Sequence, residues 1–433
     1  MGLLSGVLVP LLLGCGGVYF LCTVGVKMLR RPRQLFRAFA VGRGRGAARA
    51  LAVALAGTLG VGNIAGVATA MVLGGAGAIF WMWVSALLAM LLKYAEILLA
   101  VRNRRVENGI YHGGAMYYIK ECFGGRAGRG LAIVFAVLCL VCAFTLGGVI
   151  QTSAAAGAAM TAFRVPPLAV GLAMGIGIAL ILLGRGGERV ERACVALVPF
   201  ICVFFTVAAL AVLILRREAL PSAFAAIFKG AFSWRSGAAG GTGFLTAKAI
   251  RYGVARGLIS NEAGCGTAPI AHAAADTDSP AAQGVWGILE VFVDTVLLCT
   301  LTALVILVSG VPLTGEDGVT LALQAFGAVL GRFAAPTLAV SILLFAFATL
   351  LCWSHYGAEC LYYLTGRHGE RWMILIVFPA AVIGAVIAPG VLWELTDLVV
   401  AIMTVVNVTA LLLSRRTVIR ETRAYFGGCQ EER

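Results

Sequence analysis

The chain has 433 residues, of which 61% are hydrophobic and 12% are charged, and its formal net charge is +14. A soluble domain has roughly 25% charged residues, so this chain has too few of them to cover a surface that faces water. The composition excludes a soluble enzyme, a disordered scaffold and a nucleic-acid-binding domain, and it predicts a multi-pass protein of the lipid bilayer.

The apolar residues fall into runs long enough to cross a bilayer, since a transmembrane helix needs about 20 of them. We count eleven runs, at residues 3–26, 48–72, 77–101, 130–158, 166–183, 193–215, 240–258, 284–309, 334–364, 372–389 and 394–413. The seventh is the weakest, because Lys248, Arg251 and Arg256 interrupt it. The sequence predicts an all-α polytopic membrane protein with about eleven transmembrane helices.

Basic residues in the short loops indicate the orientation, since Lys and Arg accumulate on the cytoplasmic side. The loop after the first run has eight of them and no acidic residue: Lys27, Arg30, Arg31, Arg33, Arg37, Arg43, Arg45 and Arg49. We expect the N-terminus outside and the C-terminus in the cytoplasm, with the protein in the plasma membrane. The charges of loops 216–239 and 259–283 run against this topology.

Eleven helices can be divided into one extra helix and two units of five, and an odd number makes the two units face opposite ways. We expect the extra helix at 1–29, the first unit (spans 2–6) at 30–239, the second unit (spans 7–11) at 240–414 and a cytoplasmic tail at 415–433. Glycines interrupt the first helix of each unit, at 57–63 and 240–244. Paired interruptions of this kind indicate the binding site of a transporter.

The chemistry of a broken helix supports this interpretation. Unwound backbone at membrane depth is tolerated only where it is buried in protein or lines a cavity. The free N–H groups of the second half-helix suit a carboxylate, and the freed carbonyl groups suit an ammonium group or Na⁺. The alternative is close helix packing through small residues, which is common in membranes.

Longer motifs surround these residues. They are GTLGVGNIAGVATA (57–70), GGAGAIFWMW (74–83), KYAEILLAV (93–101), GGAMYYI (113–119), RGLISNEAGCGTAPIAHAAA (256–275), QGVWGILEVFVDTVLLCTLTALVIL (283–307), WSHYGAECLYYLTG (353–366) and LWELTDLVVAIMTVVNVTALLLS (392–414). In this order they resemble the sodium:alanine symporter family. The resemblance implies a LeuT-type 5+5 inverted repeat with one extra N-terminal helix and broken helices 2 and 7. It also implies uptake of alanine, glycine or a similar small neutral amino acid with Na⁺, or with H⁺.

The resemblance also implies site residues. Those expected to bind the substrate are Thr58, Gly60, Val61, Gly62, Asn63, Gln151, Thr242, Gly243 and Phe244. In this assignment the amides of Val61 and Gly62 face the carboxylate and Thr58 faces the amine. Asn63 caps the second half-helix or reaches an ion, and for Gln151 the alternative is a helix–helix hydrogen bond. The sodium site is expected to use Ala56, Leu59, Ala346 and Thr349.

Some positions depart from the family pattern. The family has Ser before the Thr of span 9, where this chain has Ala348, and Asn two residues after the Gln of span 4, where it has Ser153. The missing hydroxyl leaves Na⁺ and H⁺ as alternative coupling ions. Cys139 and Cys142 form a CxxC without a nearby His or second pair, so we expect no metal other than Na⁺ and no cofactor.

Charged residues within apolar runs are costly and are therefore functional candidates. Lys93 and Glu96 are spaced to pair with each other. Three residues are candidates for a gate or a second ion or proton site: Glu262, which is also spaced to cap the next helix or to pair with Arg251 or Arg256, Asp294 and His355. For Asp294 an interhelical hydrogen bond is the alternative.

The sequence analysis predicts a secondary active symporter, not an enzyme. It works by alternating access, with rocking of spans 2, 3, 7 and 8 and the substrate at the midplane between helices 2 and 7. An H⁺-coupled symporter, a transporter-like sensor and a channel stay open as alternatives. The sequence does not define the oligomeric state, and a monomer is compatible with it.

Overall fold

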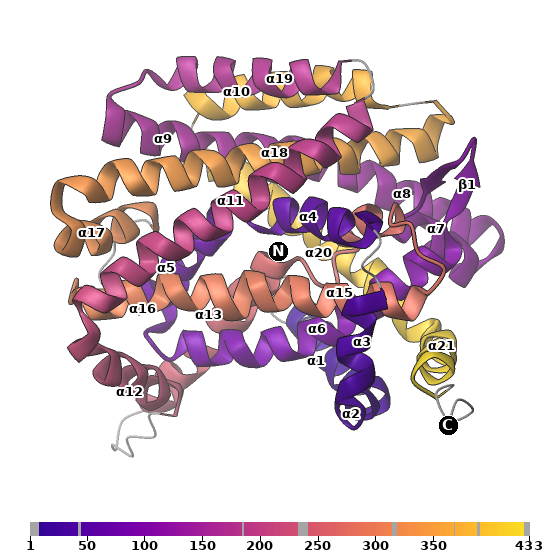
Figure 1. Ribbon diagram of the computed structural model, residues 1–433, viewed down its shortest axis with the longest axis horizontal. Helices are drawn as coiled ribbons and strands as arrows, with labels where there is room; N and C mark the ends of the chain where they lie inside the picture. Colours follow the sequence, from indigo (N-terminus) through magenta and orange to yellow (C-terminus); the bar gives the residue numbers. More distant parts are fainter. Residues whose placement is uncertain are drawn as a thin grey trace.

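The computed structural model describes residues 8–41, 45–183, 186–232, 241–313, 318–367, 369–387 and 390–427. Most long helices run side by side along the longest axis of the molecule (Figure 1). They are α1 (Val9–Phe20), α2 (Val26–Leu29), α3 (Pro32–Val41), α4 (Arg45–Thr58), α5 (Ala65–Gly74), α6 (Ala78–Asn103), α7 (Ala115–Phe123), α8 (Gly125–Phe144), α9 (Gln151–Phe163), α10 (Pro167–Leu182), α11 (Gly186–Leu215), α12 (Leu220–Ala231), α13 (Gly241–Asn261), α14 (Ala268–Ala273), α15 (Pro280–Val291), α16 (Thr300–Ser309), α17 (Gly318–Leu330), α18 (Ala334–Thr365), α19 (Glu370–Val386), α20 (Gly390–Leu413) and α21 (Arg415–Gly427).

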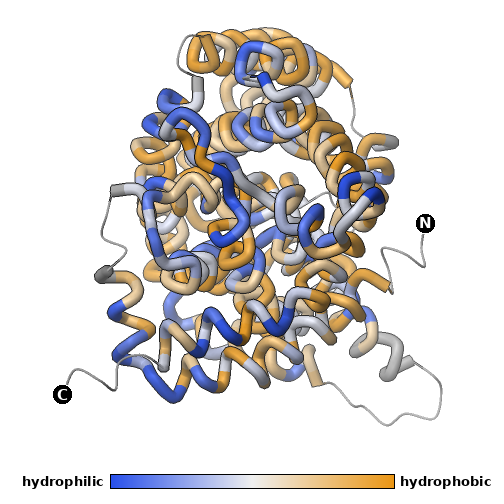
Figure 2. The backbone as a smooth tube through the Cα atoms, turned by 90° about the vertical axis from the view of Figure 1, so that its right-hand side faces the viewer, coloured by the Kyte–Doolittle hydropathy of each residue, from blue (hydrophilic) through white to orange (hydrophobic). Residues whose placement is uncertain are grey.

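Several helices continue into one another through π-helical turns. Such turns are Leu21–Gly25 between α1 and α2, Thr145–Ile150 between α8 and α9, and Phe292–Cys299 between α15 and α16. Seen along the helices, hydrophobic residues cover most of the helical body, and hydrophilic residues gather in the connecting segments and in α21 near the C-terminus (Figure 2). This distribution is that of a protein whose helices lie in lipid.

The described residues contain seven helical segments that are long and apolar enough to cross a membrane, and eight if the bent pair α4–α5 is one span. They coincide with predicted runs 1, 2, 3, 4, 6, 8, 9 and 11. The other three predicted runs correspond to α10, α13 and α19. The helices lie where the apolar runs predict them, and the number of eleven spans stays a prediction.

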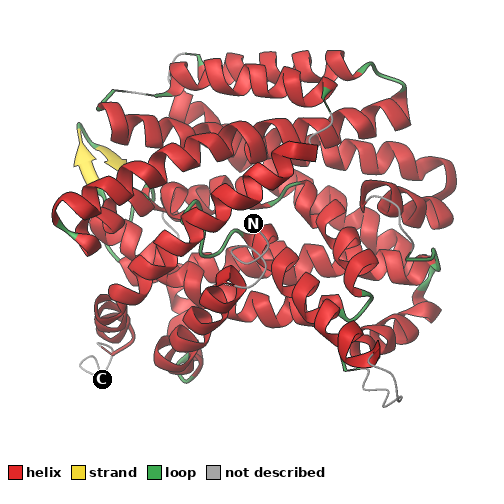
Figure 3. Cartoon of the chain, turned by 180° about the vertical axis from the view of Figure 1, so that it is seen from behind, coloured by secondary structure: helices red, strands yellow, loops and turns green. Residues whose placement is uncertain are grey.

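A short hairpin interrupts the helical pattern at one end of the molecule (Figure 3). Strand β1 (Arg105–Glu107) pairs antiparallel with β2 (Ile110–His112). Asn108 and Gly109 between them both have positive φ angles, of 53° and 77°. Asn-Gly is the preferred sequence for the tight turn that joins two such strands, so this dipeptide is the sequence signal for the hairpin.

Glycines bring α13 close to α6. A Cβ atom on Gly253 would lie 2.2 Å from the Ala78 carbonyl oxygen, and one on Gly257 would lie 2.4 Å from the Ser85 hydroxyl. Small residues spaced by four let two helix backbones approach closely in a membrane. This contact holds the C-terminal end of α13 in the centre of the molecule, where the functional groups described next are found.

Candidate functional site

The first broken helix is the pair α4–α5. The axis bends by 65° between the two halves. Gly60 is extended, with φ −129° and ψ −163°, and a single 3₁₀ turn, Val61–Asn63, leads into α5. The Gly60 N–H donates to Asn63 Oδ1 at 3.0 Å, and the Val61 N–H donates to Gln151 Oε1 at 3.2 Å. Side chains of neutral residues therefore accept from the backbone amides that the break frees.

The residues predicted for Na⁺ lie on both sides of this break. Thr349 Oγ1 on α18 donates to the Leu59 carbonyl oxygen at 3.2 Å. Ala56, three residues before Leu59, and Ala346, three residues before Thr349, are both fully buried. A Cβ atom on Gly60 would lie 3.2 Å from Thr349 Oγ1. The glycine thus leaves room for the Thr349 hydroxyl to approach the broken backbone.

A cluster that joins both halves of the molecule adjoins the first break. We call it the Asp294 cluster; it consists of Asn63, Ser260, Asn261, Asp294 and Thr295. Asn63 Nδ2 donates to Asp294 Oδ1 at 2.6 Å. Ser260 and Thr295 donate to Asp294 Oδ2 at 3.0 and 2.7 Å, and Asn261 Nδ2 donates to the Thr295 hydroxyl at 3.2 Å. Among the described residues, neutral donors thus hold this fully buried carboxylate.

The second break lies between α13 and α14, not at residues 240–244. The chain is helical from Gly241 to Asn261, and the turn that follows has three left-handed residues: Glu262, Gly264 and Gly266. A Cβ atom on Gly264 would lie 2.1 Å from Leu13 Cδ2 of α1, so only glycine fits there. The predicted position of the break is wrong for residues 241–244, which are helical, and Gly240 lies outside the described residues; the SNEAGCG segment supplies left-handed residues instead.

The predicted wall of Thr242, Gly243 and Phe244 is in the first turn of α13, and these side chains lie outside the described residues. Gly243 precedes Asn261 by 18 residues of helix, which is about 27 Å at 1.5 Å per residue. The structure therefore does not bring these three residues to the first break. Ser260 approaches it from the end of α13 instead, with its hydroxyl 3.4 Å from Asn63 Nδ2.

Charged residues surround the second break. We call Lys93, Glu96, Glu262, His272 and Glu290 the buried charge cluster. Lys93 Nζ lies 3.3 Å from Glu290 Oε1, and His272 Nε2 lies 3.2 Å from Glu290 Oε2. Glu96 Oε1 accepts the Gly266 N–H at 3.2 Å, and Thr267 Oγ1 donates to Glu262 Oε2 at 2.7 Å. The expected pairing of Lys93 with Glu96 is wrong, because Glu290 of α15 supplies the ion-pair partner.

Two further candidates have different surroundings from those expected. Glu262 accepts a hydrogen bond from the Thr267 hydroxyl across the turn, and among the described residues it forms no ion pair with Arg251 or Arg256. His355 is half-buried on α18 with its ring 6.4 Å from that of Tyr356. Neither break has a hydrogen bond to His355 in the described part of the chain.

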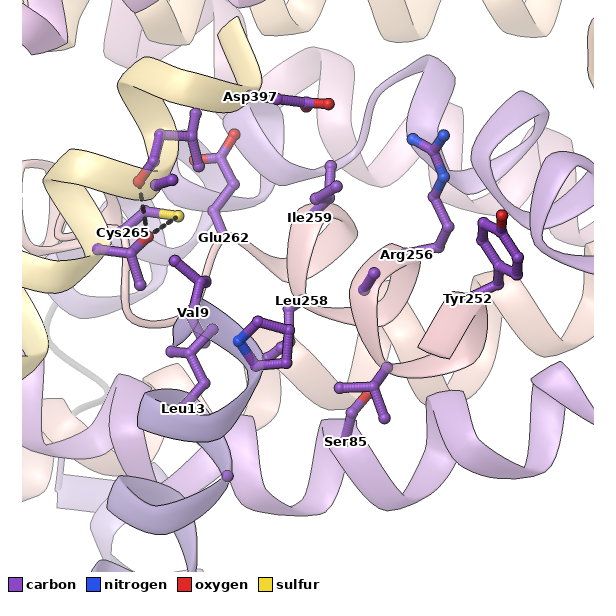
Figure 4. A pocket seen from close by; sticks show the side chains of 18 of the residues that line it. Val9, Leu13, Ser85, Tyr252, Arg256, Leu258, Ile259, Glu262, Cys265 and Asp397 are labelled. Atoms are coloured by element: carbon purple, nitrogen blue, oxygen red, sulfur yellow. Dashed lines mark hydrogen bonds between the residues drawn. The ribbon is translucent and has the colours of Figure 1, made fainter. Parts of the chain in front are cut away.

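A pocket of about 760 Å³ reaches the second break. Its walls come from α1, α6, α13 and α20, and Glu262, Cys265 and Thr267 of the turn line it. Figure 4 shows the carboxylate of Asp397 and the guanidinium of Arg256 turned toward each other on one side of the pocket. The wall is otherwise mostly apolar, and the N-terminal turns of the extra helix α1 complete it.

The chain is similar to known transporters. The model of the family described as "Sodium:alanine symporter family" matches residues 2–433. The chain is 39% identical over 383 residues to the sodium/alanine symporter AgcS of Methanococcus maripaludis, covering 87% of this chain and 83% of that protein. It is 38% identical over 424 residues to an uncharacterised transporter of Haemophilus influenzae, covering 96% and 92%.

Among solved structures, a Na⁺-coupled sialic acid symporter in a substrate-bound outward-open state is similar with a TM-score of 0.60 and 12% identity. The match covers 95% of this chain and 88% of that one, and at this identity it shows the fold alone. The LeuT-type fold expected from the sequence is confirmed. The relatives are transporters rather than enzymes, and a cation-coupled amino-acid symporter is the activity that they support. The chain, a multi-pass membrane protein, belongs to the sodium:alanine symporter family.

Proposed function

We propose that the chain imports a small neutral amino acid of the alanine and glycine class together with Na⁺. The single observation that carries this proposal is the first break, where freed backbone groups and the Thr349 hydroxyl meet. The Leu59 carbonyl and Thr349 Oγ1 are 3.2 Å apart, close enough to ligate one ion. With the carbonyls of Ala56 and Ala346 they supply oxygen ligands of the kind that Na⁺ takes at broken helices.

The substrate carboxylate binds the amides of Val61 and Gly62 in this proposal. A Cβ atom added to Gly62 would have no atom within 4 Å, so there is open space beside this residue. The Val61 amide donates to the carbonyl oxygen of Gln151, which is an uncharged counterpart of a carboxylate oxygen. Gln151 therefore holds the amide until the substrate exchanges with it. Thr58, beside the same break, faces the amino group.

Alternating access moves the broken helices together with their neighbours. α6 packs along both α13 and α15, so these helices are suited to rock as one unit with α4–α5. Na⁺ and substrate raise each other's affinity because they share the first break, and such coupling is reciprocal. In this proposal residues 1–29 are an extra helix, 30–239 and 240–414 are inverted repeats, and 415–433 are a cytoplasmic tail opposite an external N-terminus.

Asp294 fixes the relative position of the two breaks in this proposal. Its carboxylate bonds Asn63 of the first break and Ser260 at the end of α13. An H⁺-coupled symporter of the same fold is the second candidate, and the buried carboxylates of Glu262 and Asp294 favour it. His355 has no hydrogen bond to either break among the described residues, and its role in a gate or a second ion or proton site stays a prediction.

The test is uptake of labelled alanine and glycine into proteoliposomes, with a Na⁺ gradient and, separately, with a pH gradient. We expect saturable uptake driven by Na⁺. Gly62→Val should abolish it by filling the open space without disturbing the fold, because no atom lies within 4 Å of the new Cβ. Gly157→Val is the matched control, since Gly157 is exposed on α9 and equally free of neighbours.

Three results would contradict the proposal. Unchanged substrate affinity in Gly62→Val would show that the substrate does not bind at the first break. Flux that does not saturate would indicate a channel. Binding without uptake would indicate a sensor.

A further inference from the structure

The buried charge cluster holds an excess of negative charge. Glu96, Glu262 and Glu290 supply three carboxylates, and Asp294, one turn beyond Glu290, supplies a fourth. All four are between 0% and 6% exposed, as is Lys93. Even with a proton on His272, four negative charges face two positive ones. An uncompensated charge inside a protein costs several kcal/mol, so this group of residues favours the uptake of a further positive charge.

The hydrogen bonds of the cluster are also incomplete. Glu96 Oε2 is buried and makes no hydrogen bond within the described part of the chain, and Lys93 Nζ and Glu290 Oε1 have their 3.3 Å contact with each other. A buried carboxylate oxygen without a donor is rare in folded proteins and calls for an explanation. Glu96 Oε2 shows that the protein's own donors do not satisfy every carboxylate oxygen of the cluster.

The position of Lys93 decides which cation fits. Its ammonium group has Glu290, Glu96 and Glu262 as its electrostatic neighbours, so it lies among the carboxylates. A metal ion there would be repelled by the ammonium and would need several oxygen ligands at once. A proton needs a single carboxylate oxygen. The residues therefore suit a proton better than a second Na⁺.

Access to solvent singles out one carboxylate. Of the five residues in the cluster, Glu262 lines the pocket and the other four do not. Its backbone is left-handed, with φ 51°, which turns the residue out of the helical path of α13. Figure 4 shows the Glu262 side chain among those that surround the pocket. A proton from the pocket reaches Glu262 first.

We propose that Glu262 takes up a proton from the pocket and that the buried charge cluster stores it as a second coupling ion. The inference rests on the proposed function as a symporter. The carboxylate of Glu262 gains H⁺ and becomes a neutral carboxyl group, and no other bond forms or breaks. Lys93 then faces two carboxylates of the cluster instead of three. Glu262 and Glu96 bond Thr267 and Gly266, so the proton changes how the second break is held.

Other groups around Glu262 contribute to its charge balance. α6 supplies Lys93 and Glu96, α15 and the π-helical turn supply Glu290 and Asp294, and α14 supplies His272 through Glu290. The polar groups nearest from the remaining elements are Cys142 of α8, Cys352 and Tyr356 of α18, and Cys265 of the turn itself. The carboxylates among these groups favour the proton on Glu262, whereas the thiols and the phenol carry no charge between about pH 5 and pH 8.

Infrared difference spectroscopy on the purified protein, without Na⁺ or substrate, tests the proposal directly. Acidification from about pH 8 to about pH 5 should produce the carbonyl-stretch band of a newly protonated carboxyl group. Glu262→Gln should remove this band. Glu218→Gln should leave it in place, because Glu218 is exposed in the turn before α12. Absence of the band in the natural protein, or its persistence in Glu262→Gln, would overturn the proposal.

A second variant decides the matter if Glu262→Gln does not fold. Thr267→Val keeps the carboxyl group and removes the hydroxyl that donates to its ionised form at 2.7 Å. The midpoint of the band should therefore move to higher pH, and an unmoved midpoint would contradict the proposal. In proteoliposomes, an acidic outside should stimulate uptake by the natural protein and not by Glu262→Gln. The infrared band does not depend on transport, so the two proposals can fail separately. If Glu262→Gln lacks the band and the natural protein takes up no amino acid, the proton site is supported and the symporter is refuted. If Na⁺ drives uptake by the natural protein and the band persists in Glu262→Gln, the symporter is supported and the proton site is refuted.

Discussion

The two broken helices differ in the kind of group that holds them. The break between α4 and α5 is held by neutral side chains: Asn63, Gln151 and Thr349 bond its amides and carbonyl. The break between α13 and α14 is held by Asn261 and Asn407 and also by the carboxylates of Glu96 and Glu262, which lie near Lys93. The two breaks occupy equivalent places in the proposed repeats, yet their electrostatic surroundings are unlike.

This difference teaches what each break can bind. Neutral oxygens around a free amide and carbonyl suit a zwitterion and a weakly held Na⁺, which must bind and leave in every cycle. Carboxylates around a buried ammonium cannot accept a second metal ion cheaply, but they can exchange a proton. The Asp294 cluster connects the two breaks, because Asn63 and Ser260 both bond the same carboxylate. A change in the position of one break is thus transmitted to the other through Asp294.

The largest effect is expected from removing the ammonium at the second break. Lys93→Met leaves Glu290 and its neighbours buried without their lysine, and breaking a buried ion pair on one side costs about 3–5 kcal/mol. We expect a large fall in the thermal unfolding temperature of the detergent-solubilised protein, followed by intrinsic fluorescence. Lys229→Met should have no such effect, because Lys229 is exposed on α12.

A double variant makes this prediction sharper. Lys93→Met combined with Glu290→Gln removes both charges of the 3.3 Å pair. It should recover part of the lost stability, because replacing both members of a buried pair is far less costly than removing one. An unchanged unfolding temperature in Lys93→Met alone would show that the ammonium is not needed to hold the carboxylates.

An intermediate effect is expected at the first break. Thr349→Val removes the hydroxyl beside the Leu59 carbonyl and should raise the Na⁺ concentration for half-maximal uptake about tenfold, equivalent to ~1.4 kcal/mol. Thr349→Ser keeps the hydroxyl and should behave normally. Thr161→Val is the control, since Thr161 also bonds the carbonyl four residues earlier but lies exposed on α9. Ala348→Ser should strengthen Na⁺ binding, because it returns the hydroxyl that the family has at this position. If all these variants show the same Na⁺ dependence as the natural protein, the ion binds elsewhere.

Most helices could be predicted from the sequence, because the length needed to cross a membrane is a property of a local run of residues. The runs at 77–101 and 394–413, for example, correspond to α6 and α20. The first break could be predicted too, since Gly57 to Asn63 interrupt an apolar run. The number of spans could not be fixed, because α10 and α19 are shorter than a full crossing and their roles depend on their neighbours.

The position of the second break could not be predicted from the local sequence. Two glycine-rich segments adjoin α13, and the sequence does not say which one is the break. Long-range packing decides: Gly264 must accommodate Leu13, and a Cβ atom on Gly266 would lie 2.9 Å from Phe135. The Asn63–Asp294 bond joins residues 231 positions apart, and Lys93 finds Glu290 rather than Glu96. Such pairings depend on the fold as a whole.

A second pair of His and Glu joins the hairpin to the end of α18, and it can be compared with His272 and Glu290. His112 of β2 bonds Glu359 through Nδ1 at 2.9 Å, and its ring stacks on Tyr362 with centroids 3.8 Å apart. Burial lowers the pKa of His112, but the hydrogen bond and charge of Glu359 outweigh burial, so the pKa is raised above its ordinary value. This pair fastens the hairpin to the end of α18.

The smallest expected effect follows from that pair. A raised pKa in the folded state means that the stabilisation is fully present below about pH 6.5, the ordinary value for His, and is lost as the pH rises through the folded pKa. The loss should be below about 1 kcal/mol, as for other pairs near a protein surface. The thermal unfolding temperature should therefore fall slightly as the pH rises across this range. Glu359→Gln should remove this fall, whereas Glu394→Gln, at an exposed position on α20, should keep it. If the unfolding temperature still falls in both variants, the titrating group is not His112. The comparison between the His112–Glu359 pair and the His272–Glu290 pair would then not hold. If Glu359→Gln alone removes it, the pH dependence belongs to the His112–Glu359 pair at the end of α18, whereas His272 and Glu290 are paired in the fully buried interior.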